Sequence, residues 1–198
     1  MNSWPAEISL LRTIIDQPDD DTPRLIYADW LEEQGEQPRA ELIRVQVEAA
    51  DLFRRRYDVQ RAIGLRDRGF ALLRQHEKHW AREFQPYVEN WTFERGFIEY
   101  IALPASDFVA RGDFLFERAP IRRMYLLGVG DLLPKIVESP HLARLTTLYL
   151  RGAIGEITEH LTKSPYLEQI EQLELMGLRL SFEEQRVLIG RFGNRVRF

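Results

Sequence analysis

The residues most able to do chemistry are a short acidic run and two histidines in the first half of the chain. Asp19, Asp20 and Asp21 are consecutive carboxylates, and His76 and His79 are three residues apart, as zinc ligands on one helix can be. A calcium loop would also need alternating ligands, a turn glycine and a distal glutamate, and none follows the acidic run in register. The histidines lack further ligands at matching spacing. We therefore predict no metal site, and we expect the carboxylates to cap a helix start.

A run of three arginines, Arg54 to Arg56, could contact phosphate groups. Asp51 and Asp58 flank the run, so local ion pairs on a solvated helix face are the preferred interpretation. The chain has 27 basic and 31 acidic residues, a net charge of −4. It lacks the positive excess that binding to a phosphate backbone needs. We expect no nucleic-acid partner.

The sequence also argues against catalysis and against a membrane protein. Its Asp, Glu and His residues show no spacing typical of a nucleophile, a base or a phosphate loop, so we expect no enzymatic activity and no cofactor. The chain has no cysteine, which excludes disulfides and cysteine catalysis and fits a cytoplasmic protein. No apolar run reaches the roughly 18 residues of a membrane span. The first residues lack the basic and apolar regions of a secretory signal.

The elements that must position these residues begin with short amphipathic helices. One is expected over residues 6–15. A second should start with Thr22 as its N-cap and end at Gly35. A third should begin near Pro38, and a fourth should cover 65–84 after a break near Gly64, with Phe70 among its apolar residues. The expected buried face of the second helix consists of Leu25, Ile26, Trp30 and Leu31.

One stretch of this helical part is distinctive enough to carry a resemblance. Its core is the run Tyr27-Ala28-Asp29-Trp30-Leu31-Glu32-Glu33, preceded by Pro18 to Ile26 and followed by Arg39 to Gln46. Over residues 7–46 this pattern resembles the bacterial repeat-companion domain. The resemblance implies a short helical module ahead of leucine-rich-type repeats, and it supplies no catalytic residues.

An apolar triplet recurs four times in the second half of the chain, at steps of 23, 24 and 25 residues. A period in the twenties is typical of a solenoid, in which each unit buries its apolar face against the next. Val196 and Phe198 continue the series by a further 23 residues. The triplets are Ile98/Ile101/Leu103, Ile121/Met124/Leu126, Leu145/Leu148/Leu150 and Ile170/Leu173/Leu175.

These patterns predict an α/β protein with two parts. Residues 1–88 form a helical repeat-companion region, packed on a short leucine-rich-repeat-like solenoid with a parallel sheet at 89–198. Its first strand should be an N-terminal cap containing Trp91 and Phe93. The asparagine that usually follows each strand in leucine-rich repeats is replaced by Val129, Ala153 and Leu178. The side-chain ladder of regular repeats is therefore missing.

Alternate residues of a strand point to opposite faces, so the apolar triplets leave a second set exposed on a concave face. Tyrosine and arginine there match the composition of protein interfaces, although a tyrosine pair can also simply stabilise a sheet. We predict a protein-interaction or scaffold module, with an immunity-like or inhibitor-like regulator of a neighbouring gene product as the alternative. The sequence fixes neither the partner nor the oligomeric state. The candidate protein-binding residues are Arg123, Tyr125, Tyr149, Arg151 and Glu174.

Overall fold

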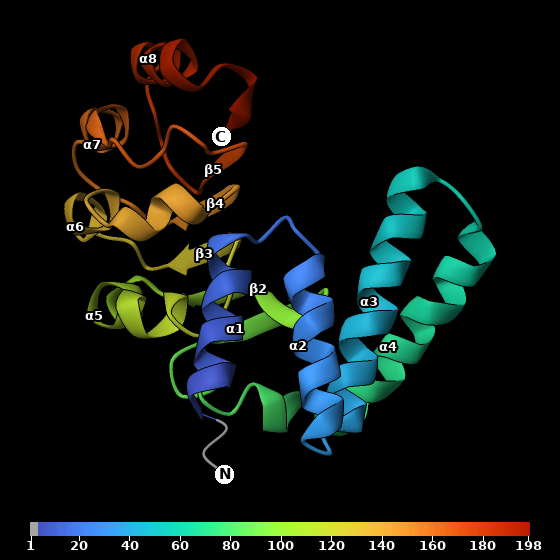
Figure 1. Cartoon of the computed structure of the whole chain (residues 1–198). Coiled ribbons are helices and arrows are strands. Elements are labelled where there is room, and N and C mark those ends of the chain that lie inside the picture. Colours follow the sequence, from blue (N-terminus) through green and yellow to red (C-terminus); the bar gives the residue numbers. More distant parts are fainter. Residues whose placement is uncertain (1–3) are drawn as a thin grey trace. The chain divides into compact units, whose positions relative to one another are not determined.

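The computed structural model describes residues 4–198, and within them the protein is α/β (Figure 1). One six-stranded sheet has the order β1-β2-β3-β4-β5-β6, and each pair from β2–β3 to β5–β6 is parallel. The predicted fold class and parallel sheet are thus confirmed. The strands are β1 (Asn90–Glu94), β2 (Phe97–Pro104), β3 (Arg123–Leu127), β4 (Thr147–Arg151), β5 (Gln172–Met176) and β6 (Val196–Arg197).

The chain divides into two compact units. The first takes the described residues up to Pro86 together with 92–99 and 117–120, and the second takes 87–91, 100–116 and 121–198. The helices of the first unit are α1 (Trp4–Asp16), α2 (Thr22–Glu33), α3 (Gln37–Arg55) and α4 (Val59–Trp80). Those of the second are α5 (Ala105–Phe116), α6 (Leu133–Val137), α7 (Ile157–Lys163) and α8 (Phe182–Phe192).

The start of α2 differs from the prediction by one residue. Asp21, not Thr22, is the residue that precedes the helix, and its side chain makes no capping bond. The Asp20 carboxylate instead accepts a hydrogen bond from the Thr22 N–H, at 2.8 Å. The acidic run therefore does serve the helix start, through Asp20.

The predicted buried face of α2 is partly wrong. Leu25 and Ile26 are 39% and 51% exposed. The buried stripe is Arg24, Tyr27, Ala28 and Leu31, which has the i, i+3, i+4, i+7 spacing of one helix face but begins with an arginine.

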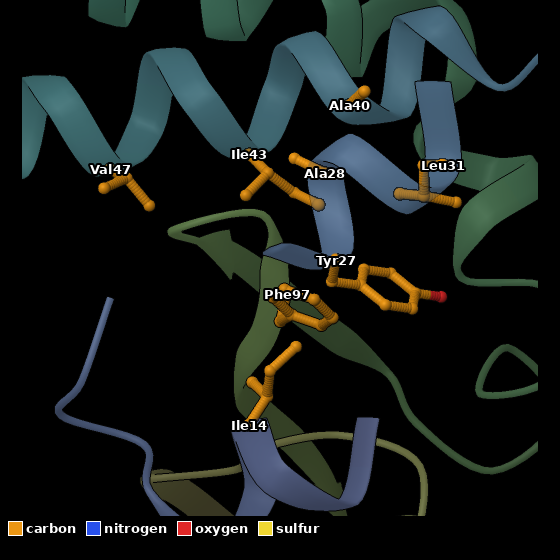
Figure 2. Packing of buried hydrophobic residues seen from close by; sticks show 8 residues of the cluster. All are labelled: Ile14, Tyr27, Ala28, Leu31, Ala40, Ile43, Val47 and Phe97. Atoms are coloured by element: carbon orange, nitrogen blue, oxygen red, sulfur yellow. The ribbon is translucent and has the colours of Figure 1, made fainter. Parts of the chain in front are cut away.

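The core of the first unit lies between α1, α2, α3 and the start of β2. Figure 2 shows Ala28 of α2 next to Ile43 of α3, and Tyr27 of α2 next to Phe97 of β2, with Ile14 of α1 close to Phe97. The eight side chains in that view are all buried. They are Ile14, Tyr27, Ala28, Leu31, Ala40, Ile43, Val47 and Phe97.

The expected helix break near Gly64 is also wrong, since α4 runs through that residue. The chain turns earlier, at residues 56–58, where Arg56 and Asp58 have φ of 52° and 45°. Asp58 then caps α4, because its carboxylate accepts the Arg61 N–H at 3.1 Å. A glycine on an exposed helix face costs only about 1 kcal/mol relative to alanine, so Gly64 does not end the helix. Phe70, one of the apolar residues of this helix, is 55% exposed.

In the second unit the strands pair in the register that the apolar period predicts. Met124 lies opposite Leu148, Leu148 opposite Leu173, and Leu173 opposite Val196. Figure 1 shows α5, α6 and α7 along one side of the strands. The inward residues of β3, β4 and β5 are almost completely buried. They are Met124, Leu126, Leu148, Leu150, Leu173 and Leu175.

Backbone hydrogen bonds join the turns after β3 and β4. The Val129 N–H donates to the Arg151 carbonyl at 3.0 Å, and the Gly130 N–H donates to the Gly152 carbonyl at 2.8 Å. Val129 and Ala153, which lie in these turns, are buried. Buried apolar side chains and backbone hydrogen bonds therefore connect these two turns.

Candidate protein-binding face

The face of the sheet opposite the buried triplets carries the predicted site. One row across the strands is Ala102, Tyr125, Tyr149 and Glu174, in the predicted register, and Arg197 of β6 extends it. The neighbouring row is Tyr100, Arg123, Thr147 and Gln172. We use the name tyrosine face for Tyr100, Arg123, Tyr125, Tyr149, Gln172 and Glu174, which are all half-buried.

Three aromatic rings form the centre of this face. The rings of Tyr125 and Tyr149 lie 5.8 Å apart between centroids, tilted by 48°. The Arg123 guanidinium lies 5.6 Å from the centre of the Tyr100 ring, within the range of a cation–π contact. Burial, together with the nearby Tyr149 and Tyr125, raises the pKa of Tyr100. Its phenol therefore remains protonated and able to donate a hydrogen bond at neutral pH.

A polar group adjoins the tyrosines. Glu174 accepts a hydrogen bond from the Gln172 side-chain amide, and Arg197 lies 3.5 Å from the same carboxylate. Arg151 and Met176 are opposite each other at the ends of β4 and β5, and both are exposed. The structure therefore brings Arg123, Tyr125, Tyr149 and Glu174 onto one surface, with Arg151 at its edge.

Besides Gln172, two residues of this surface are absent from the predicted set, Tyr100 and Arg197. Tyr100 lies two residues before Ala102, so strand alternation places both on the same face. Arg197 lies between Val196 and Phe198, the two residues that continue the apolar period. The signal for both residues was thus present in the sequence, in the same alternation that identified Tyr125 and Tyr149.

The acidic run and the histidine pair take structural roles instead. Asp21 lies 3.1 Å from Arg95 and 3.4 Å from Arg54. His76 stacks on Trp80 with ring centroids 5.1 Å apart. Among residues 4–198 no group of three or more histidines and acids is placed to hold a metal ion.

A histidine that the sequence did not single out also lies beside a hollow. His141 Nε2 is 2.7 Å from the Asp113 carboxylate, and the histidine ring stacks on Phe116 at 4.7 Å. The hollow, about 130 Å³, is lined by Phe108, Gly112 and Lys135 among others. The Asp113 side chain is 90% exposed, so its contact with His141 lies at the protein surface, while the histidine ring packs against Phe116.

In the part of the chain that the structure describes, no helix has both the length and the apolar character needed to cross a membrane. Comparison of the chain with protein-family models, curated proteins and solved structures found no match.

Proposed function

We propose that this chain is a non-enzymatic protein-interaction module that binds a partner protein through the tyrosine face. The observation that carries the proposal is the cluster of Tyr100, Tyr125 and Tyr149 with Arg123 on a sheet face whose opposite side is the apolar core. Tyrosine and arginine are the residue types that most often dominate the energetics of protein interfaces.

The chemistry of the face suits a protein surface of mixed polarity. Tyrosine offers a large apolar ring with a hydroxyl at its tip and loses little side-chain entropy on binding. Glu174, Arg123 and Arg197 provide charges of both signs around the rings. Exposed Met176 adds an adaptable apolar contact at the edge.

We further propose that residues 89–198 form a short leucine-rich-repeat-like solenoid and that residues 7–46 are a repeat-companion module. Strands β2 to β5 pair so that the corresponding apolar residues of successive repeats lie opposite one another. This register and the 23–25-residue period support the first proposal. The motif resemblance alone supports the second. The lack of cysteine supports a cytoplasmic setting for the interaction.

The double substitution Tyr125→Ala with Tyr149→Ala tests this function. We expect loss of partner capture in an affinity pull-down from the native host, followed by mass spectrometry. Binding of the purified partner should weaken by at least about tenfold in calorimetry, because hot-spot aromatic residues are removed. A cross-strand aromatic pair contributes only about 0.2–1 kcal/mol to a sheet, so the unfolding midpoint should fall by no more than about 4 °C.

Tyr166→Ala is the matched control, because Tyr166 is half-buried and lies between α7 and β5, outside the sheet. This variant should retain the captured partner. Equal loss of capture in the control would contradict a role for the tyrosine face. A large drop in the unfolding midpoint of the double variant would instead assign the tyrosine pair to packing.

A further inference from the structure

The turn between α3 and α4 concentrates positive charge on an otherwise acidic chain. Residues 53–66 contain five arginines and one aspartate, a local net charge of +4, whereas the whole chain carries −4. α3 and α4 pack side by side, and Figure 1 shows the turn that joins them at one end of the pair. We use the name arginine turn for residues 53–66.

The arginine turn also exposes apolar side chains. Tyr57 is 69% exposed, Val59 is 48% exposed and Phe53 is 38% exposed. The Arg66 guanidinium lies 5.9 Å from the centre of the Phe53 ring. Exposed apolar groups with polar or charged residues around them are typical of an interaction surface.

The backbone of the turn holds Tyr57 between two strained residues. Arg56 and Asp58 both have positive φ, a conformation that costs a residue with a side chain about 1–2 kcal/mol. Asp58 gains a capping bond to α4, which offsets part of this cost. Strained backbone is often found where a chain must present a side chain for binding.

Carboxylates of the same unit already pair with four of the five arginines of the turn, Arg54, Arg55, Arg61 and Arg66. Arg55 lies 3.0 Å from Asp51, and Arg61 pairs with Glu48. Further along α4, Arg68 donates two hydrogen bonds to the Glu41 carboxylate, at 2.6 and 2.7 Å. Arg56 is exposed, and within residues 4–198 no carboxylate forms an ion pair with it. An exposed guanidinium without an ion pair can bind a carboxylate from another chain through two parallel hydrogen bonds.

We propose that the arginine turn docks an acidic peptide segment of a partner protein. Tyr57 and Val59 contact apolar residues of the segment, and Arg56 binds its carboxylates, with Arg55 and Arg66 adding to the local field. The proposal concerns a surface separate from the tyrosine face and does not depend on it.

The charges near the turn favour a peptide over an extended polyanion. Asp51, Asp58 and Asp67 adjoin the arginines and repel the dense phosphates of a nucleic acid or an anionic bilayer. A peptide can place single carboxylates between these acids.

The test is fluorescence anisotropy of the full chain with a labelled peptide of Glu-Ser-Leu repeats, in which single carboxylates are spaced apart. Saturable binding that weakens with added salt is expected, and a Gln-Ser-Leu peptide should not bind. Arg56→Glu should weaken binding at least about tenfold, and Tyr57→Ser should weaken it severalfold. Absence of saturable binding to the natural chain would overturn the proposal.

Arg74→Glu is the matched charge control, because Arg74 is exposed on the same helix α4 but away from the turn. This variant should bind the peptide like the natural chain, and equal weakening would refute docking at the turn. Poly(U) RNA and phosphatidylserine vesicles serve as competing probes. Tighter binding of either one, abolished by Arg56→Glu, would replace the acidic peptide with that class of partner.

Discussion

At the scale of single residues, the most unusual feature is an arginine in the core of the first unit. Arg24 is 0% exposed, and its guanidinium lies 2.9 Å from the Glu99 carboxylate. It also donates to the carbonyls of Arg95 and Pro18, at 3.2 and 3.0 Å. Burial lowers the pKa of Arg24 to about 10, and the nearby Glu99 opposes this shift. The arginine therefore remains charged at neutral pH.

Removing one partner of the Arg24–Glu99 ion pair should lower the stability of the fold. Arg24→Met leaves Glu99 buried with Arg95 as its remaining partner, and we expect the free energy of unfolding to fall by about 3 kcal/mol in urea titration. The double variant Arg24→Met with Glu99→Leu removes both buried charges, while Arg95 keeps Asp21 at 3.1 Å. It should recover most of the loss. A double variant no more stable than the single one would show that the charge pair is not the cause.

A second residue-scale prediction concerns pH and the start of α8. The Ser181 N–H donates to the Glu184 carboxylate at 2.8 Å, while the Glu184 N–H donates to the Ser181 hydroxyl. The backbone and side-chain bonds from Ser181 lower the pKa of Glu184. Its contribution to stability is therefore present above the ordinary glutamate pKa and is lost as pH falls through the lowered value.

Glu184→Ala should accordingly lower the thermal unfolding midpoint at neutral pH. The difference from the natural chain should shrink as the solution is acidified below about pH 4. A difference that stays constant from neutral to acidic pH would contradict a role for the ionised carboxylate. Circular dichroism at a series of pH values measures both midpoints.

At the scale of elements, the turn between β1 and β2 is fixed by close contact with α3. The Gly96 N–H donates to the Gln46 side-chain oxygen at 2.8 Å, and the Gln46 amide donates to the Phe93 carbonyl at 3.2 Å. A Cβ on Gly96 would lie 2.2 Å from the Ile43 side chain and 2.9 Å from its Cα. Only glycine allows the strand turn to approach the helix this closely.

Gly35 offers a matched comparison for this contact. Gly35 and Gly96 have φ of 85° and 86°, but a Cβ on Gly35 would meet nothing within 4 Å. Gly35→Ala should cost about 1–2 kcal/mol, from backbone strain alone. Gly96→Ala should cost a further 1–3 kcal/mol or so, because it overpacks the core. Urea unfolding of both variants measures the difference, and similar losses would argue against the close approach.

At the scale of the whole molecule, the α/β class, the parallel sheet and the strand register could be predicted from the sequence. Apolar residues that recur every 23–25 positions specify register strongly, because a slip by one residue would expose the buried set. The same alternation placed Tyr125 and Tyr149 side by side. The two-unit arrangement of residues 1–88 and 89–198 stays a prediction.

The failed predictions have different physical reasons, one a distant partner and another a local helix signal. The buried face of α2 was misjudged because an arginine normally faces water, and Glu99, far along the chain, makes its burial possible. The break near Gly64 was misjudged because glycine weakens a helix without ending it, whereas Asp58 starts one. The exposure of the apolar residues in the arginine turn depends on where the chain turns. The turn lies at residues 56–58, which the sequence did not predict.

The pairing of Arg24 with Glu99 has a consequence for synthesis on the ribosome. Helices α1 to α4 are translated before Glu99, yet segment 92–99 belongs to their compact unit and supplies the counter-ion for Arg24. Until that carboxylate emerges, closing the helices would bury an uncompensated charge. The nascent helices should therefore remain open to water, and the first unit can close only after the β1–β2 turn has left the exit tunnel.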